Sequence, residues 1–289
     1  MLARALEGGK MLRPKLVILS AYVANPQAEE SAVLAAAEAA ELIHCATLAH
    51  DDVLDESDLR RGKETLNKTW GTQAGVLLGD SLLARVFALL TETGKADFSL
   101  EIITTCGNMI CSEIDQSQRL RDLDYWRENY DKVIRDKTAS FMSVCCKMGA
   151  AIAGGDKDTA DILARYGVKA GMAFQIADDL LDMFGAEQVI GKPRGSDLRE
   201  GQYTLPVLIA LDRVDNPHEF RAMITAHEPD VEAAAEIVRK YSLDECRLRA
   251  RKYAEEAAAE LDALPPSEHV DELKRMAFYF IERCDDLIS

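Results

Sequence analysis

The stretch GMAFQIADDLLDMF, residues 171–184, decides how this chain folds. On an α-helix its Gln175, Asp178 and Asp182 share one face, because residues three or four apart lie above one another. The remaining positions are almost all apolar, which is typical of a helix that is buried on nearly every side. Carboxylates in such a helix are costly to bury unless cations neutralise them. The stretch therefore predicts a core helix that carries a cation-binding stripe.

A second stretch, HDDVLD at residues 50–55, repeats the D-D-x-x-D pattern of the first. Asp51 and Asp55 lie four residues apart, and the same helical face continues back through Leu48 to His44. Carboxylates at this spacing are hard oxygen ligands of the kind that bind Mg²⁺ together with phosphate groups. A solvated helix end is the alternative for each cluster, and neither has the glycine-turned loop of an EF-hand calcium site. We interpret both clusters as binding Mg²⁺ and a diphosphate.

Basic residues are informative in so acidic a chain, because several of them flank the aspartate clusters or precede apolar helices. Each on its own reads as an ordinary surface cation, and His44 reads equally as a satisfied buried histidine or as a phosphate donor. Together they have the chemistry to hold two polyanions, one through metal ions and one through direct hydrogen bonds. The cations in question are Lys10, Arg13, Arg60, Arg61, Lys137 and Lys192.

Composition excludes several classes of protein. The chain has 289 residues, with 34 Lys and Arg against 50 Asp and Glu, so its net charge is −16. Nucleic acids and anionic membrane surfaces bind basic faces, so neither is expected as a partner. The seven cysteines include no C-x-x-C pair, which favours free thiols in a reducing cytoplasm. No signal peptide is visible, residues 204–211 are the nearest approach to a membrane span, and no membrane insertion is predicted.

Helical periodicity runs through almost the whole chain, and Gly and Pro fall between the periodic segments. No repeat, low-complexity tract or change of composition marks a second domain. We therefore predict one all-α domain over residues 1–289, a helical bundle of about ten helices at the usual mean helix length.

Five motifs make the sequence resemble a known family. In chain order they are GGKMLRP, LIHCATLAHDDVLDESDLRRG, DKTASF, FQIADDLLD and GKPRGSDLREGQYTLP, and they span residues 8–206. The sequence resembles the trans-type (head-to-tail) isoprenyl diphosphate synthases of the polyprenyl synthetase family. The resemblance implies a homodimer with an all-α fold around a deep central cavity, and two aspartate-rich helices that face each other across its mouth. It also implies Mg²⁺-dependent condensation of isopentenyl diphosphate with an allylic diphosphate by ionisation, condensation and elimination.

The functional residues of the family carry over to the matching positions of this chain. The isopentenyl diphosphate contacts that the resemblance implies are Lys10, Arg13, His44 and Arg61, with Phe174 beside the isopentenyl group. The contacts to the allylic substrate that it implies are Arg60, Lys137, Thr138, Gln175 and Lys192. The direct Mg²⁺ ligands that it implies are Asp51, Asp55 and Asp178, with Asp52 and Asp182 in support. Catalysis is expected to depend on the direct ligands and on Lys137, Thr138 and Gln175, of which the last two stabilise an allylic cation.

Three features depart from the family pattern. Gln202 and Tyr203 stand just before the T-L-P segment, where family members often carry a Lys, so one contact to the allylic phosphate is in question. Ser112 stands where a Gly is common, which concerns packing. The chain begins almost at its GGK motif, so we expect a first family helix to be missing.

Ala46 and Thr47, one turn before Asp51, bear on product length. In the family, bulky aromatic residues there close the cavity under the growing chain and give short products. Both side chains are small here, so we expect products longer than C20, in the range C30–C50. The alternatives are a short-chain farnesyl or geranylgeranyl diphosphate synthase and the catalytic subunit of a heteromeric synthase. A terpene cyclase would not need cations for a second diphosphate, and a non-enzymatic helical subunit would have lost one aspartate cluster.

Overall fold

The computed structural model describes residues 11–55, 57–60, 63–93, 96–186 and 193–288, without the side chains of residues 96–98. Most of these residues are helical, and the strands among them are two short segments of one antiparallel hairpin. The all-α prediction is therefore confirmed. Several helices, such as α4, α11 and α13, are shorter than the mean length on which the estimate of about ten helices rests.

The chain divides into two compact units. The first comprises the described parts of Met1–Thr104, Met142–Gly167 and Leu261–Leu273, and the second comprises those of Thr105–Phe141, Val168–Glu260 and Lys274–Ser289. The prediction of a single domain over residues 1–289 stays a prediction.

The elements up to the middle of the chain are mostly those of the first unit. They are α2 (Leu12–Ala24), α3 (Glu30–Leu54), β1 (Leu59–Arg60), β2 (Lys63–Glu64), α4 (Leu66–Trp70), α5 (Thr72–Glu92) and α6 (Ala96–Ser117). The later elements are α7 (Leu123–Ile134), the π-helix η1 (Arg135–Ala139), α8 (Ser140–Ile152), α9 (Lys157–Phe184), α11 (Ser196–Glu200), α12 (Leu205–Arg213), α13 (Pro217–Ile224), α14 (Val231–Tyr241), α15 (Leu243–Glu260), the 3₁₀ helix η2 (Leu261–Ala263) and α16 (Glu268–Ile288).

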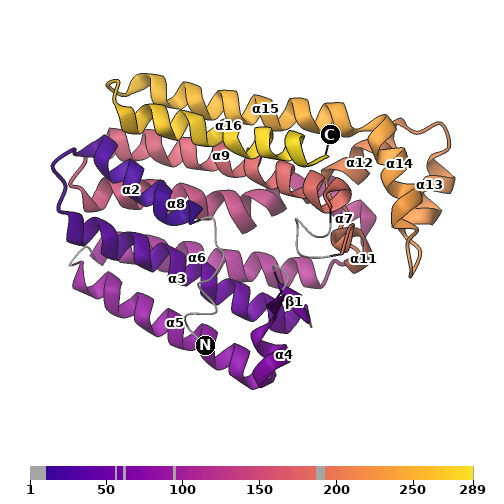
Figure 1. Ribbon diagram of the computed structural model, residues 1–289, viewed down its shortest axis with the longest axis horizontal. Coiled ribbons are helices and arrows are strands. Elements are labelled where there is room, and N and C mark those ends of the chain that lie inside the picture. Colours follow the sequence, from indigo (N-terminus) through magenta and orange to yellow (C-terminus); the bar gives the residue numbers. More distant parts are fainter. Residues whose placement is uncertain (1–10, 56, 61–62, 94–95, 187–192, 289) are drawn as a thin grey trace. The chain divides into compact units, whose positions relative to one another are not determined.

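In the first unit, α3 lies between α2 and α5 and packs against both (Figure 1). Its sequence is rich in Ala and Leu, which favour helix and leave a small-residue face that neighbouring helices approach closely. Near the end of α3, His50 lies over Gly79 of α5, with its Nε2 3.3 Å from the carbonyl oxygen of Val76 and 3.5 Å from Asp80. These contacts fix the end of α3 that carries the first aspartate cluster.

In the second unit, the part of α9 from Val168 onward is enclosed, as its sequence predicts. Ala173, Ile176 and Leu180 have no exposed surface. Helix α15 lies beside the part of α16 that belongs to this unit (Figure 1), and Arg247 binds Asp285 across them at 2.8 Å. The result is a scaffold that holds the end of α9 in place.

The sequence-based search for membrane spans was wrong about the nearest candidate. Among the described residues, α3 and α5 are long and apolar enough to cross a membrane by length and composition alone. The relevant window of α3 is 61% buried, as in the core helix of a globular protein, whereas that of α5 is 33% buried. The prediction missed them because it looked for an uninterrupted apolar run, and single polar residues interrupt both. The cytoplasmic location and the absence of membrane insertion stay predictions.

Gly149 provides a test of the packing between α8 and α2. A Cβ atom at this position would lie 2.1 Å from the carbonyl oxygen of Val17 and 2.8 Å from the amide nitrogen of Ala21. Alanine normally gains about 1 kcal/mol over glycine inside a helix. Here the backbone clash outweighs that gain, and we expect Gly149→Ala to lower the free energy of unfolding by about 1–3 kcal/mol.

The measurement is urea unfolding followed by circular dichroism. Lys252→Ala, at an exposed position of α15, serves as the control and should stay within about 0.5 kcal/mol of the parent chain. A Gly149→Ala chain as stable as the control would contradict this close approach of α8 to α2.

Candidate functional site

The aspartate cluster of α9 lies at the C-terminal end of that helix. Asp178 is exposed, whereas Asp179 and Asp182 are only 2% and 3% exposed. The segment after the helix returns to hold this end: the amide of Gly195 donates to the Asp182 carbonyl at 2.8 Å, and the amide of Asp197 donates to Asp182 Oδ2 at 3.3 Å. Backbone donors therefore help to fix the last carboxylate of the cluster.

Asp179 belongs to a chain of hydrogen bonds that links three elements. The hydroxyl of Tyr130 on α7 donates to Asp179 Oδ2 at 2.6 Å, and Gln175 Nε2 donates to Asp179 Oδ1 at 3.0 Å. Gln175 Oε1 in turn accepts a hydrogen bond of 2.7 Å from the hydroxyl of Thr138. Two of the predicted site residues, Thr138 and Gln175, are thus brought into direct contact.

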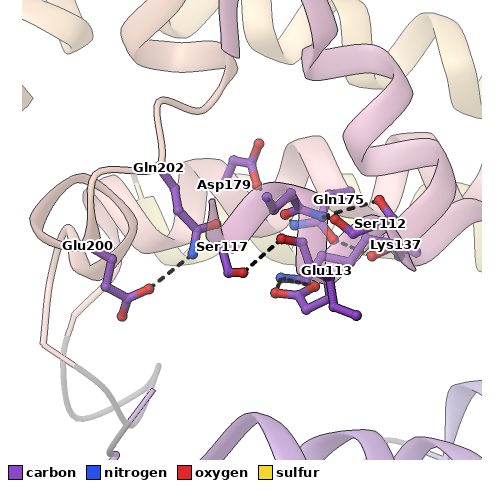
Figure 2. Close-up of polar contacts among 11 residues, drawn as sticks. Ser112, Glu113, Ser117, Lys137, Gln175, Asp179, Glu200 and Gln202 are labelled. Atoms are coloured by element: carbon purple, nitrogen blue, oxygen red, sulfur yellow. Dashed lines mark hydrogen bonds and ion pairs between the residues drawn. The ribbon is translucent and has the colours of Figure 1, made fainter. Parts of the chain in front are cut away.

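Lys137 and Thr138 lie on η1, the short π-helix between α7 and α8. Such a turn is uncommon and occurs often at functional sites, because its extra residue redirects the side chains that it carries. Thr138 is buried, and Lys137 forms an ion pair of 3.1 Å with Glu113 on α6. Figure 2 shows Lys137 with Glu113 and Gln175 with Asp179 in one region of the second unit.

Burial dominates the electrostatics of this region. It raises the pKa of Asp179 well above its ordinary value, and the nearby negative charges of Asp197 and Asp178 raise it further. The hydrogen bonds that the carboxylate accepts from Tyr130 and Gln175 act in the opposite direction. Burial also raises the pKa of the Tyr130 hydroxyl, with Asp179 as the next cause. A concentration of carboxylates of this kind favours a bound cation.

The aspartate cluster of α3 is arranged differently. Asp52 is 6% exposed, Asp51 is half-buried and Asp55 is exposed. Arg60 Nε on β1 forms an ion pair of 2.5 Å with Asp52 Oδ1, and the side-chain amide of Asn67 donates to the Asp52 carbonyl at 3.0 Å. Arg60, expected at the allylic diphosphate, therefore has a carboxylate partner within its own unit.

The remaining predicted residues vary in their surroundings. Arg13 on α2 and His44 on α3 are half-buried. The half-buried ring of Phe174 packs edge-on against Phe280, with 4.9 Å between ring centroids. Lys10, Arg61 and Lys192 lie outside the described residues. The roles assigned to all these side chains stay predictions.

Carboxylate oxygens at both clusters match the ligand preference of Mg²⁺. Within the described ranges, no three Asp, Glu, His or Cys side chains converge closely enough to hold a metal ion on their own. Mg²⁺ commonly binds one or two carboxylates and completes its shell with water and substrate phosphate oxygens. The donor set therefore fits ions that bind together with a diphosphate.

Sequence reasoning missed Tyr130 and gave no role to Glu113. Tyr130 lies two helical turns before Lys137, a spacing that places it on the same side of a helix. That was the available signal, but a tyrosine in an amphipathic helix is most simply a core residue. Its contact with Asp179 joins residues 49 positions apart, and local sequence patterns do not report such contacts.

Comparison with known proteins gives a consistent picture. Residues 1–241 match the family model described as polyprenyl synthetase. Octaprenyl diphosphate synthase of Escherichia coli is 36% identical, and heptaprenyl diphosphate synthase component 2 of Geobacillus stearothermophilus is 35% identical. Geranylgeranyl diphosphate synthase of Methanosarcina mazei is 34% identical. Each of these alignments covers 96% of this chain and 86% of the relative.

Solved structures agree with this result. A polyprenyl synthase from Caulobacter crescentus, complexed with calcium and isoprenyl diphosphate, matches with a TM-score of 0.90 at 35% identity, covering 96% of this chain and 85% of that one. A geranylgeranyl pyrophosphate synthase from Corynebacterium glutamicum, complexed with isoprenyl diphosphate and magnesium, matches with a TM-score of 0.83 at 29% identity, covering 96% and 88%.

Proposed function

The chain belongs to the polyprenyl synthetase family and is a prenyltransferase, and from this premise we infer how its own residues divide the work. An allylic diphosphate binds at the two aspartate clusters, and isopentenyl diphosphate binds at a separate set of cations. Asp51, Asp55 and Asp178 hold Mg²⁺, with Asp52 and Asp182 in support. When bound, Mg²⁺ neutralises the diphosphate so that it becomes a better leaving group.

The observation that carries this inference is the direct contact between Thr138 and Gln175 beside the aspartate cluster of α9. Fixed dipoles whose oxygen ends face a developing positive charge stabilise it without reorganising. Asp179 accepts a hydrogen bond from Gln175 and holds that side chain beside Thr138. Lys137, close to Thr138 on η1, contributes a positive charge for the departing diphosphate. Lys192 and Arg60 are assigned to the allylic diphosphate as well.

The reaction needs no nucleophilic side chain. The allylic carbon–oxygen bond breaks, and its electron pair leaves with the diphosphate. The double bond of isopentenyl diphosphate then supplies the pair for the new carbon–carbon bond. Loss of a proton to the departing pyrophosphate leaves an allylic diphosphate that is five carbons longer. Lys10, Arg13, His44 and Arg61 hold the isopentenyl diphosphate, and Phe174 packs beside its apolar part.

We expect Asp178→Asn to lower kcat by on the order of 10²–10³-fold, because an amide replaces a charged oxygen ligand at the exposed end of α9. The assay follows labelled isopentenyl diphosphate into product, with Mg²⁺ and geranyl, farnesyl or geranylgeranyl diphosphate as primer. Asp158→Asn, an exposed aspartate in the first turn of the same helix, is the matched control. Parental turnover in Asp178→Asn would refute the metal role.

We infer that the product is longer than C20, in the range C30–C50. The relatives include heptaprenyl and octaprenyl synthases as well as geranylgeranyl synthases, so the family alone leaves the length open. Ala46 is 1% exposed, and the Thr47 hydroxyl donates to the His44 carbonyl at 2.9 Å. An aromatic ring at this point of α3 would reach well beyond the two small side chains that stand there.

Ala46→Phe should therefore shorten the product distribution, as resolved by chromatography of the dephosphorylated chains. The ring is too large for the enclosed position and takes up space next to the growing chain. Ala46→Ser, of nearly the parental size, serves as the control and should keep the parental products. An unchanged long-chain distribution from a folded Ala46→Phe chain would contradict this role for Ala46.

A homodimer is the assembly that the surface favours. Helix α5 is apolar enough to pass for a membrane span, yet Leu77 and Phe87 are 58% and 50% exposed. On α6 the exposed apolar residues are Leu100, Ile103, Ile110 and Ile114, at spacings that place them along one side of the helix. Exposed apolar residues gathered along a helix in this way are typical of an interface.

Replacing both Leu77 and Phe87 by Glu should convert the dimer to a monomer, because the charges would be buried at the interface without partners. Sedimentation velocity measures the change in mass. Gln73→Glu, also exposed on α5, adds a charge outside the apolar positions and should leave the dimer intact. A dimer that survives the double substitution would place the interface elsewhere.

The heteromeric alternative is supported by the Geobacillus relative, which is called component 2 of heptaprenyl diphosphate synthase. The same incorporation assay separates the two cases. A homomeric enzyme turns over as the purified chain, whereas a catalytic subunit remains inactive with every primer until a partner is added. The cytoplasmic location and the absence of nucleic-acid or membrane partners belong to the same proposal.

A further inference from the structure

Tyr130 makes a contact that the reaction as described above does not use. Its side chain is 4% exposed, and its hydroxyl lies 2.6 Å from Asp179 Oδ2 in the interior of the second unit. Asp179 is itself 2% exposed and touches neither solvent nor, in the proposed function, the diphosphate. Buried polar groups need hydrogen-bond partners, and the other partner of this carboxylate is Gln175.

The direction of each hydrogen bond in this network follows from the groups that meet in it. An amide NH₂ group only donates hydrogen bonds, and an amide oxygen only accepts them. Tyr130 donates its hydroxyl proton to one oxygen of Asp179, and Gln175 donates from its NH₂ group to the other. The carbonyl end of Gln175 then faces Thr138, whose hydroxyl has to be the donor in the contact of 2.7 Å.

The outcome is a fixed polarity along the network. Because the Thr138 proton is engaged by Gln175, the hydroxyl oxygen presents its lone pairs to the remaining surroundings. The carbonyl oxygen of Gln175 likewise keeps a second lone pair. Both groups therefore turn the negative ends of their dipoles outward from the network. With the opposite polarity, N–H and O–H groups would face the same space and would repel a developing cation.

We propose that Tyr130 is a positioning residue, which locks the carboxylate of Asp179 so that Gln175 and Thr138 present oxygen rather than hydrogen to the allylic cation. Without the tyrosine hydroxyl, the carboxylate is free to turn about its Cβ–Cγ bond, and the Gln175 amide loses the acceptor that fixes its orientation. This inference rests on the proposed function, since it acts through Gln175 and Thr138. Tyr130 itself touches neither substrate nor reacting atoms.

The contact between Tyr130 and Asp179 also bears on the π-helix η1. Thr138 lies on a π-turn, closed by a hydrogen bond from the Ser140 amide to the Arg135 carbonyl. Two side-chain contacts tie this turn to neighbouring helices. Thr138 donates a hydrogen bond to Gln175 on α9, and Lys137 forms an ion pair with Glu113 on α6. Because Asp179 orients Gln175, Tyr130 acts on the turn through the contact between Gln175 and Thr138.

The chain contains a matched control for the decisive variant. Tyr125, one and a half turns earlier on α7, donates its hydroxyl to Asp115 at 2.7 Å, so it makes the same chemical contact. That pair is exposed and has no link to Gln175 in the described network. Tyr125→Phe therefore removes the same atom from the same helix without touching Asp179.

We expect Tyr130→Phe to lower kcat by about 10- to 100-fold, because dipole orientation acts on the transition state. The KM values for isopentenyl diphosphate and the allylic primer should change by less than about twofold. Tyr125→Phe should match the parent chain in all three values. In a Gln175→Ala background, Tyr130→Phe should have almost no further effect, because it acts through the residue that is already removed.

The pattern of results separates this inference from the function beneath it. Parental kcat in both Gln175→Ala and Thr138→Ala would overturn the proposed site, and the role of Tyr130 with it. Slow Gln175→Ala with parental kcat in Tyr130→Phe would overturn only the role of Tyr130. Losses in Tyr130→Phe and Gln175→Ala that multiply in the double variant would show a merely structural tyrosine and would also overturn it.

A second variant covers the case in which Tyr130→Phe does not fold. Asp179→Asn keeps the tyrosine but leaves one oxygen to accept its hydroxyl, so the asparagine NH₂ faces Gln175 and reverses its amide. The loss in kcat should be of the same size as that expected for Tyr130→Phe, with thermal unfolding close to that of Tyr125→Phe. Undiminished kcat in a folded Asp179→Asn chain would overturn the proposal.

Discussion

The burial of carboxylates inside an apolar helix is the constraint on which the second unit depends. Asp179 and Asp182 are almost completely enclosed within α9. An enclosed charge without hydrogen-bond donors costs several kcal/mol, on the order of 3–5 when a partner is lost. The structure meets this cost with a tyrosine from α7, an amide side chain from the same helix and a backbone amide at α11. Two of these donors join other elements, α7 and α11, to the end of α9, so satisfying the buried carboxylates also builds the site.

The two clusters satisfy their buried carboxylates by different means. Asp52 on α3 has a full positive charge beside it, the guanidinium of Arg60. Asp179 on α9 receives neutral donors, and the negative charges of Asp197 and Asp178 raise its pKa beyond the effect of burial. Both clusters share the D-D-x-x-D pattern, so this difference follows from the partners that each buried carboxylate has in its own unit.

Sequence periodicity predicted the helices that carry both clusters, but it did not predict which carboxylates of each cluster are buried. For α9 the stripe through Gln175, Asp178 and Asp182 was expected to be the important face. The structure encloses Asp182 of that stripe together with Asp179, which the prediction left out, and exposes Asp178. A helix with apolar residues on nearly every side gives no preferred face, so the rotation is set by its neighbours. The π-turn at Arg135–Ala139 could not be predicted either. Its Thr138 and Lys137 contact residues that are distant in sequence, and local sequence patterns do not report such contacts.

The net charge of −16 first indicated a protein that avoids anions, yet the chain belongs to a family whose substrates are diphosphates. The contradiction disappears when charge is considered by position. Carboxylates spread over the surface set the overall charge, whereas the groups close to a bound substrate set the local field. A negative local field suits both halves of a prenyl transfer, since it attracts the metal ions that hold the diphosphate and stabilises the cation left behind. The hydrogen-bond polarity imposed by Asp179 extends that field through neutral groups, which stabilise a cation without offering it a strongly basic or nucleophilic atom.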